Sequence, residues 1–374
     1  MNGRISVWPP LPPSAWLRPP RDTLPFPFGE PGCRLYARAR HGIWQGVRAL
    51  GLAEGDEVLA PAYHHGSEIE ALLRAGLRCR FYDVGASLGP HEDELEALAG
   101  PRTRALYLTH PLGLSVDPPR WRAWCDRKGV VLIEDAAQAW LASWEGRAVG
   151  SFGDLAVFCL YKTFGLPDGA AAVSTAALPA PTARPAGGLR VALRRQGAWA
   201  AQRWAPVAAA RNRQRARRAA RQVLPPVDPQ ADHALGDPAT PPSAVSAWLL
   251  PRVADPGTAE RRRANYRALL ERLPGAVPPP FDELPDGASP FAFPVAAPDK
   301  DALWRDLAAQ GIDALSFWTH PHGTLPDGGF PQAARLRSTV VGLPVHQELR
   351  PLDVDRMADA VGKHLGTRAA EAPA

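Results

Sequence analysis

Apolar and polar residues follow two different periods along the first half of the chain. Segments of helical period are separated by short, wholly apolar runs such as GDEVLAPAY, RALYLTH and VVLIED. In RHGIWQGVRALGL, for example, Ile43, Val47 and Leu50 share one helical face, and a glycine follows where the helix would end. Helices that alternate with short strands apolar on both faces are typical of a doubly wound, mostly parallel sheet. The pattern therefore predicts an α/β fold.

The pattern changes in the second half of the chain. Residues 187–222 form an arginine-rich segment interleaved with alanine, and a turn at Asp255 precedes the helical run TAERRRANYRALLERL. The strands FAFPVA and STVVGLPVH then alternate with the helices DKDALWRDLAAQGI and DVDRMADAVGKHL. We therefore expect a large domain over residues 31–255, which includes the arginine-rich segment, and a smaller C-terminal α+β domain over residues 256–374.

The first 30 residues are rich in proline, which favours an extended, polyproline-like arm. The tryptophans Trp8 and Trp16 indicate that this arm is an ordered strap that packs on its own subunit or on a neighbouring one. The stretch has no continuous apolar segment of the kind found in signal peptides, and no apolar run in the chain approaches the length of a membrane span. We therefore expect a cytoplasmic protein with no membrane partner.

Composition narrows the class of protein further. The 374 residues are 22% charged and 45% hydrophobic, which excludes an intrinsically disordered chain. The four cysteines are far apart, so neither a disulfide scaffold nor a metal site is expected. The arginine-rich segment favours a solvated helix pair or a basic rim that attracts a diphosphate-bearing substrate or an anionic carrier. Nucleic acid is not an expected partner, because the net charge is only +5 and no binding motif accompanies the arginines.

An acid and an amide follow the apolar strand VVLIED. Asp135 ends this strand beside Glu134, and Gln138 follows among three alanines. Strand carboxyl ends face the ligand crevice in open α/β sheets, and small alanines let a flat ligand approach Gln138, which offers both a donor and an acceptor. Alternatively, an acid at a strand end is simply solvated.

Lysine is rare in this chain, and one lysine stands out. Only four of the 43 basic residues are lysine, and Lys162 follows the apolar strand DLAVFCL between Tyr161 and Phe164. Lysine can lose its proton and bond a carbonyl, whereas arginine cannot. We expect burial to lower the pKa of Lys162 toward that of a nucleophilic amine. The alternative is a structural lysine paired with Asp154 or Asp168.

Taken together, these stretches resemble the DegT/DnrJ/EryC1/StrS family of pyridoxal-phosphate aminotransferases, which have PLP fold type I. The combination of EDAAQA with GSFGD is the most specific part of the resemblance. The matching stretches occur in family order over most of residues 30–365: GLAEGDEVLAPAY, ALLRAGLRCRFYDV, PRTRALYLTHPLG, VVLIEDAAQAW, GSFGDLAVFCLYK, RRRANY and GLPVHQELRPLDVDRMADAV. Members mostly aminate keto groups on nucleotide-linked sugars, as homodimers with shared active sites.

The resemblance implies a cofactor, substrates and roles for particular residues. The cofactor is pyridoxal 5'-phosphate (PLP), and the substrates are a keto compound and an amino donor such as glutamate. Lys162 would bond the PLP aldehyde, Asp135 would pair with the pyridinium nitrogen, and Gln138 would bond the phenolic oxygen. His65 takes the place of the family's stacking aromatic residue, although His64 and His65 also fit a hydrogen-bonded loop pair.

Three positions depart from the family pattern. Cys159 stands where relatives have a phosphate-binding serine, and Lys162 follows it by three residues whereas Phe164 occupies the family's lysine position. The Ser-x-x-Lys spacing does occur more widely among fold type I enzymes. Arg40 lies in the segment where relatives carry Ser-Gly-Thr, and it would hold the phosphate through a charge-assisted contact. The family's Gly-Tyr-Asn segment is missing, which leaves open a non-transaminase PLP reaction or a non-catalytic binding role.

Overall fold

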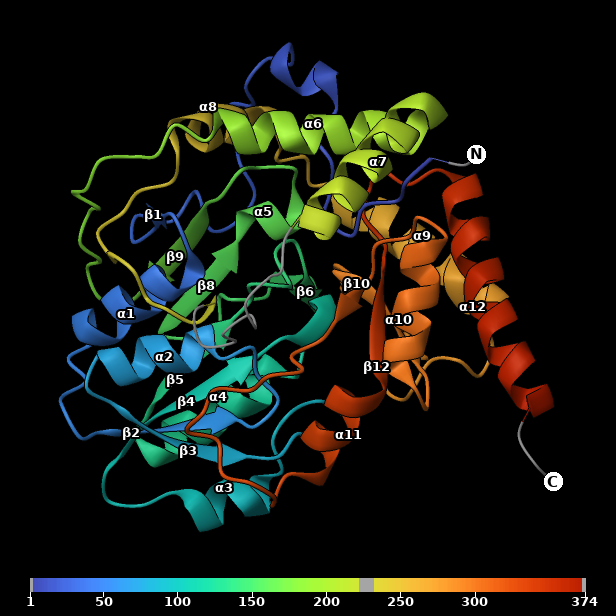
Figure 1. The fold of residues 1–374 in the computed structure, drawn as a ribbon. Coiled ribbons are helices and arrows are strands. Elements are labelled where there is room, and N and C mark those ends of the chain that lie inside the picture. The colour runs from blue at the N-terminus through green and yellow to red at the C-terminus, as the bar shows by residue number, and fades with distance from the viewer. Residues whose placement is uncertain (1–2, 222–231, 372–374) are drawn as a thin grey trace.

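The computed structural model describes residues 3–221 and 232–371 (Figure 1). The first two residues of the expected arm and the last residue of the arginine-rich segment lie outside this range. The main feature is a seven-stranded sheet of strand order β1-β9-β8-β5-β4-β2-β3. Its strands are β1 (Arg34–Tyr36), β2 (Glu57–Pro61), β3 (Arg78–Tyr82), β4 (Thr103–Thr109), β5 (Val131–Asp135), β8 (Leu155–Cys159) and β9 (Ala170–Ser174). Strands β3, β2, β4, β5 and β8 pair in parallel, and β9 and β1 pair antiparallel, so the predicted mostly parallel α/β sheet is confirmed.

Helices cover this sheet, and the first of them contains Ile43 and Val47 of the helix that the sequence predicts. They are α1 (Ala39–Ala49), α2 (Ser67–Arg74), α3 (Glu92–Leu98) and α4 (Pro118–Lys128). Two glycines let α1 pack closely on the sheet, because a Cβ at Gly46 would lie 2.4 Å from the side chain of Leu155 and one at Gly42 would lie 2.8 Å from that of Ala172. Only the missing side chains make this approach possible.

A second, three-stranded sheet belongs to the C-terminal part of the chain. Its order is β10-β12-β11, all antiparallel, with β10 at Ala292–Ala296, β11 at Leu315–Ser316 and β12 at Val340–Pro344. The accompanying helices are α9 (Thr258–Arg272), α10 (Lys300–Ala309), α11 (Pro331–Thr339) and α12 (Pro351–Glu371). The prediction that STVVGLPVH is entirely strand is wrong at its start, because Ser338 and Thr339 complete the last turn of α11. The expected domain boundary near Asp255 stays a prediction.

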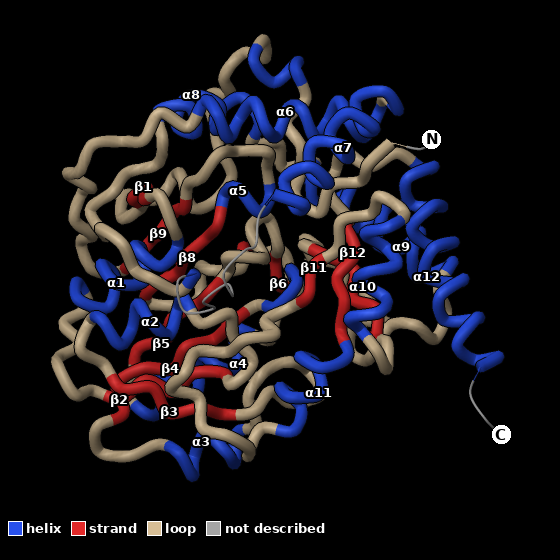
Figure 2. The backbone as a smooth tube through the Cα atoms, viewed as in Figure 1, coloured by secondary structure: helices blue, strands red, loops and turns tan. Residues whose placement is uncertain are grey.

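The arm is mostly loop, with one short helix, η1 (Pro13–Trp16) (Figure 2). The ring centroid of Trp8 lies 6.2 Å from that of Tyr161 and 5.8 Å from that of Phe291. Trp16 stacks on Trp248 at 5.7 Å. The expectation that the arm packs through its tryptophans is therefore confirmed, and these contacts lie within its own subunit.

The arginine-rich segment forms two helices, α6 (Leu189–Arg203) and α7 (Ala205–Arg221), as the sequence predicts. Helix α8 (Ala244–Val253) shares a buried apolar cluster with α6, to which Ala192 of α6 and Leu249 of α8 both belong. Within the part of the chain that the structure describes, no helix is both long and apolar enough to cross a membrane. The remaining elements are α5 (Leu160–Thr163), η2 (Pro111–Gly113) and the hairpin strands β6 (Ser143–Trp144) and β7 (Arg147–Ala148).

Candidate functional site

The carboxyl ends of three parallel strands bring the candidate residues together. β4 ends at Thr109, which lies opposite Asp135 at the end of β5, and β8 ends at Cys159. Helix α5 begins directly after β8 and carries Lys162 in its single turn. Because parallel strands end at the same edge of a sheet, residues distant in sequence become neighbours there.

Asp135 is buried, so the alternative of a solvated acid is wrong. Its side chain is 8% exposed, one oxygen accepts a hydrogen bond from the Tyr107 hydroxyl at 2.7 Å, and the other accepts one from the Ala137 N–H at 2.9 Å. Burial raises the pKa of Asp135, and the negative charge of Glu68 adds to this rise. A cationic partner at this carboxylate would be favoured, because it would compensate the cost of burying the charge.

The neighbouring acid, Glu134, faces the opposite way and has a structural role. One of its oxygens accepts hydrogen bonds from the N–H groups of Phe152 and Gly153 at 2.7 and 2.6 Å. The other accepts from the Gly150 N–H at 3.0 Å and from His110 Nε2 at 3.2 Å. The two most specific sequence motifs, EDAAQA and GSFGD, are therefore joined through this one buried carboxylate.

Lys162 shares the electrostatic environment of Asp135. Burial by itself lowers the pKa of the Lys162 amine, but the acidic groups of Cys159, Tyr161, Asp135 and Glu68 outweigh burial, and the net direction is upward. The expectation of a lowered pKa is therefore wrong for the protein without cofactor. Sequence reasoning counted the apolar neighbours of the lysine, but neither the ionisable Cys159 and Tyr161 beside it nor the two carboxylates that the fold brings to it.

Neither alternative partner of Lys162 pairs with it. Asp154 forms an ion pair with Arg122 at 2.7 Å. Asp168 accepts hydrogen bonds from the hydroxyls of Ser243 and Ser246 at 2.8 and 2.6 Å. The interpretation of Lys162 as the structural partner of Asp154 or Asp168 is therefore wrong.

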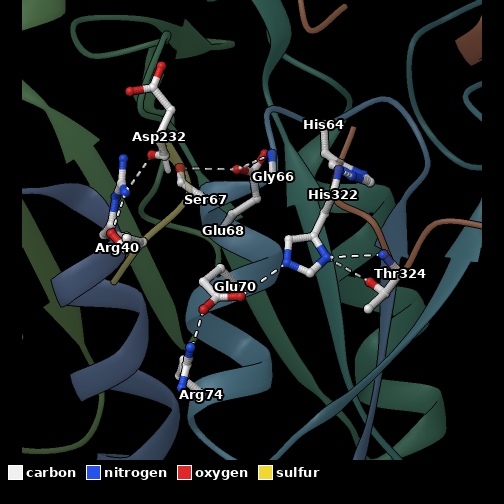
Figure 3. Close-up of polar contacts among 11 residues, drawn as sticks. Arg40, His64, Gly66, Ser67, Glu68, Glu70, Arg74, Asp232, His322 and Thr324 are labelled. Carbon is white, nitrogen blue, oxygen red and sulfur yellow. Dashed lines mark hydrogen bonds and ion pairs between the residues drawn. The ribbon is translucent and has the colours of Figure 1, made fainter. Parts of the chain in front are cut away.

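Glu68 is a site residue that sequence reasoning missed. It is 5% exposed at the start of α2, where one oxygen accepts a hydrogen bond from the His65 N–H at 2.9 Å. The other oxygen accepts one from the Gly66 N–H at 3.1 Å (Figure 3). Its charge also acts on Asp135 and Lys162. The available signal was an acid in the first helical turn after a glycine, which by itself indicates only a helix start.

The two adjacent histidines have different surroundings. His64 is fixed on both sides, because Nδ1 lies 2.9 Å from the Pro61 carbonyl and Nε2 accepts a hydrogen bond from the His322 N–H at 3.1 Å. The Nδ1 atom of His65, by contrast, is buried without a hydrogen-bond partner. Burial lowers the pKa of His65, which favours a neutral ring. His64 thus fits the loop-pair interpretation, and His65 keeps a free ring nitrogen.

The remaining predicted residues are placed as follows. Gln138 accepts a hydrogen bond from the Leu112 N–H at 2.7 Å, which leaves its NH2 group as a donor. Cys159 is a buried free thiol. Arg40 donates from one nitrogen to the carbonyls of Asp232 and Ala234 at 2.8 and 2.6 Å, so part of its guanidinium group holds a loop (Figure 3). Its role at a phosphate stays a prediction.

Arg262, in the RRRANY motif on α9, is a second residue that sequence reasoning missed. Its side chain is 1% exposed, and it donates to the carbonyls of Lys162 at 3.2 Å, Thr163 at 2.7 Å and Pro290 at 3.1 Å. Burial lowers its pKa to about 9, so it remains a cation at neutral pH. A cation at the carboxyl end of α5 is favoured by the peptide dipoles there, and it fixes the backbone that carries Lys162.

The residues at this edge of the sheet fit PLP. The Nδ1 atom of His65 and the hydroxyl of Thr109 are both buried without partners, although nearly all such groups in folded proteins are hydrogen-bonded. They accompany a buried carboxylate and an amine, the two groups that PLP enzymes place at the ring nitrogen and the aldehyde. Unpaired polar atoms beside this acid and amine indicate a site built for a polar ligand.

The parallel sheet with a lysine and an acid at its carboxyl edge is the architecture of PLP fold type I. The aminotransferase TlmJ from Streptoalloteichus hindustanus has the same fold, with a TM-score of 0.65 and 23% identity over 90% of this chain and 87% of that one. Residues 37–184 match the model of the DegT/DnrJ/EryC1/StrS aminotransferase family. The predicted resemblance to this family of PLP-dependent aminotransferases is thus confirmed over residues 37–184.

Two curated relatives show how far the similarity extends. The dTDP-3-amino-3,4,6-trideoxy-alpha-D-glucose transaminase of Streptomyces venezuelae is 27% identical over 351 residues, which cover 84% of this chain and 78% of that protein. The GDP-perosamine synthase of Vibrio cholerae is 30% identical over 131 residues, which cover 34% of this chain and only 36% of that enzyme. The short alignment is the more identical of the two.

Proposed function

We propose that this protein is a PLP-dependent aminotransferase that moves an amino group from an amino acid such as glutamate to the keto group of a nucleotide-linked sugar or a secondary-metabolite intermediate. The observation that carries this proposal is the meeting of Asp135 and Lys162 at one edge of the sheet, each within the other's electrostatic field. The relatives support the acceptor class, because both are named for nucleotide-linked sugar chemistry.

PLP, when bound, supplies a ring that accepts the electrons released at the donor's Cα carbon. Asp135 would hold a proton on the ring nitrogen, since its charge is buried and gains from a cationic partner. Gln138 would donate its NH2 group to the phenolic oxygen, and His65 would lie over the ring. Lys162 would hold the aldehyde and afterwards move a proton with its released amine.

Two further residues are proposed to bind the phosphate. Cys159 is buried beside the amine, and Arg40 lies on the first turn of α1, where backbone N–H groups favour an anion. The chain thus replaces the family's hydroxyl groups by a thiol and a guanidinium. A homodimer and a cytoplasmic location remain predictions, as does the division into arm, large domain and small domain.

Covalent trapping tests the proposal. The purified protein should turn yellow with PLP, and borohydride should bleach it and leave the cofactor on the peptide that contains Lys162. Lys162→Ala should abolish this labelling, whereas Lys128→Ala, which removes a surface lysine paired with Glu96, should not change it. A colourless preparation with added PLP would contradict the catalytic function, and labelling of another lysine would contradict the site.

Turnover tests the reaction class. Glutamate should convert the cofactor to its amino form, and a panel of nucleotide-linked keto sugars should restore the original spectrum with one preferred member. If the protein binds PLP on Lys162 but no amino acid changes its spectrum, a non-transaminase reaction or a binding role replaces the aminotransferase proposal.

A further inference from the structure

A cavity of about 520 Å³ lies between the arm, helices α6 and α7, and the segment that enters β11. It is separate from the residues assigned above to the cofactor. Four arginines line it, and they come from three different parts of the chain: Arg4, Arg194, Arg195 and Arg211. The fold therefore gathers positive charge that the sequence shows only as an arginine-rich run.

The acid in this cavity is already neutralised. Asp313 is the one acidic residue among the cavity's described lining residues, and it forms an ion pair with Arg4. Arg4 also donates to Asn212 at 3.2 Å. Asp313 therefore offers no unpaired carboxylate to Arg194 and Arg195, the two cavity-lining arginines of α6.

Among the arginines that line the cavity, Arg195 gives the clearest indication of an anion-binding site. Its side chain is half-buried, and this desolvation lowers its pKa to about 10, so it is still a cation at neutral pH and would gain from an anionic partner. Its contacts are a long hydrogen bond of 3.5 Å to the Pro9 carbonyl and the ring of Trp8, whose centroid lies 5.6 Å away. No carboxylate among the residues that the structure describes forms an ion pair with it. Such a guanidinium group is suited to an anion supplied by a ligand.

The other walls of the cavity are apolar. Val7, Trp8, Val191 and Leu315 line it together with alanines of α6. A cavity of this size with apolar walls and a few charged groups is typical of small-molecule sites. Inorganic phosphate would use only the charged part, whereas a nucleoside diphosphate has both a planar base for the apolar wall and a diphosphate for the arginines.

The cavity also reaches the neighbourhood of the proposed reacting amine. Trp8, which lines it, packs on Tyr161 and Phe291, with centroid distances of 6.2 and 5.8 Å. The amine of Lys162 lies 5.8 Å from the Phe291 ring centroid. Trp8 and Phe291 thus form an aromatic contact that runs from the wall of the cavity to the surroundings of Lys162.

We propose that this cavity binds the nucleoside diphosphate part of the amino acceptor, with Arg194 and Arg195 holding the diphosphate and Trp8 forming a wall beside it. The inference rests on the proposed function, because it assigns a location to one part of that substrate. The arm would then be part of the substrate site, and the paired helices of the arginine-rich segment would be its anion-binding wall.

Binding of dTDP, UDP and GDP to the full-length protein tests this inference by calorimetry, with inorganic pyrophosphate and thymidine as partial ligands. We expect at least one nucleoside diphosphate to bind more tightly than both partial ligands, and high salt to weaken it. Arg195→Gln should weaken binding about tenfold or more, since a hydrogen bond between charged groups contributes at least that factor. Arg194→Gln should also weaken nucleotide binding. Because Arg194 is exposed, this variant can still be measured if the Arg195 variant does not fold.

Arg190→Gln is the matched control, because Arg190 is exposed on the same helix and does not line the cavity. Its affinity should equal that of the unmodified protein. Unchanged nucleotide affinity in both the Arg195 and Arg194 variants would overturn the inference, as would pyrophosphate binding as tightly as the nucleotides. Borohydride labelling of Lys162 reports separately on the proposed function, so either proposal can fail while the other stands.

Discussion

Glu134→Gln offers a sharp test of the hydrogen-bond network that joins the two sequence motifs. In the native protein four donors share the two carboxylate oxygens: the N–H groups of Gly150, Phe152 and Gly153, and His110 Nε2. An amide of the same shape keeps one oxygen and replaces the other by an NH2 group. Whichever way the amide is turned, two of the four donors then face another donor.

His110 cannot relieve this conflict by changing its tautomer. Its Nδ1 atom accepts a hydrogen bond from the Val116 N–H at 3.1 Å, so the ring proton must stay on Nε2, toward position 134. Each buried donor without an acceptor costs about 1–3 kcal/mol. Two such donors give a predicted loss of about 2–6 kcal/mol, a large part of the 5–15 kcal/mol typical of a folded protein.

Urea unfolding of the cofactor-free protein measures this loss, with Glu145→Gln as the matched control. Glu145 is exposed in the turn between β6 and β7, so its change to glutamine should stay within about 0.5 kcal/mol. If Glu134→Gln changes the free energy of unfolding by less than about 1 kcal/mol, the assignment of Glu134 as acceptor of four buried donors is refuted.

Two more predictions concern buried cationic or titratable groups. Arg262→Lys keeps the charge but cannot reach the carbonyls of Pro290, Lys162 and Thr163 together, so it should destabilise the protein by about 2–4 kcal/mol in urea unfolding. Arg267→Lys, at a half-exposed position on the same helix, is its control, and equal effects of the two changes would contradict the role of Arg262. Burial lowers the pKa of His346 to about 3, below that of an unfolded histidine, so the unfolded state binds the proton first. The contribution of His346 is complete above about pH 6.5 and falls by about 1.4 kcal/mol per pH unit toward pH 3, and His346→Gln should flatten the decline measured between pH 7 and 5. An unchanged slope in that variant would show that His346 is not buried in its neutral form.

Much of the large sheet could be predicted from local pattern. Strands such as β5 and β8 are apolar on both faces because helices cover both sides of a parallel sheet, and this leaves unbroken apolar runs in the sequence. Asp135 and Lys162 could be singled out for a related reason. Each follows such a run directly, and strand ends are where an open sheet exposes its ligand crevice.

The sequence by itself thus determined the elements, the edge of the sheet that carries the chemistry, and two of the residues on it. Only the tertiary structure decided the electrostatics of that edge. The pKa of Lys162 rises because Cys159 and Tyr161, its neighbours in the chain, act together with Asp135 and Glu68, which only the fold brings near its amine. Likewise, Arg195 on α6 became a candidate anion ligand only because the folded structure places the arm beside it to form a cavity. Hydrophobic pattern is local and repeats along the chain, whereas the energy of a buried charge depends on the neighbours that folding brings to it.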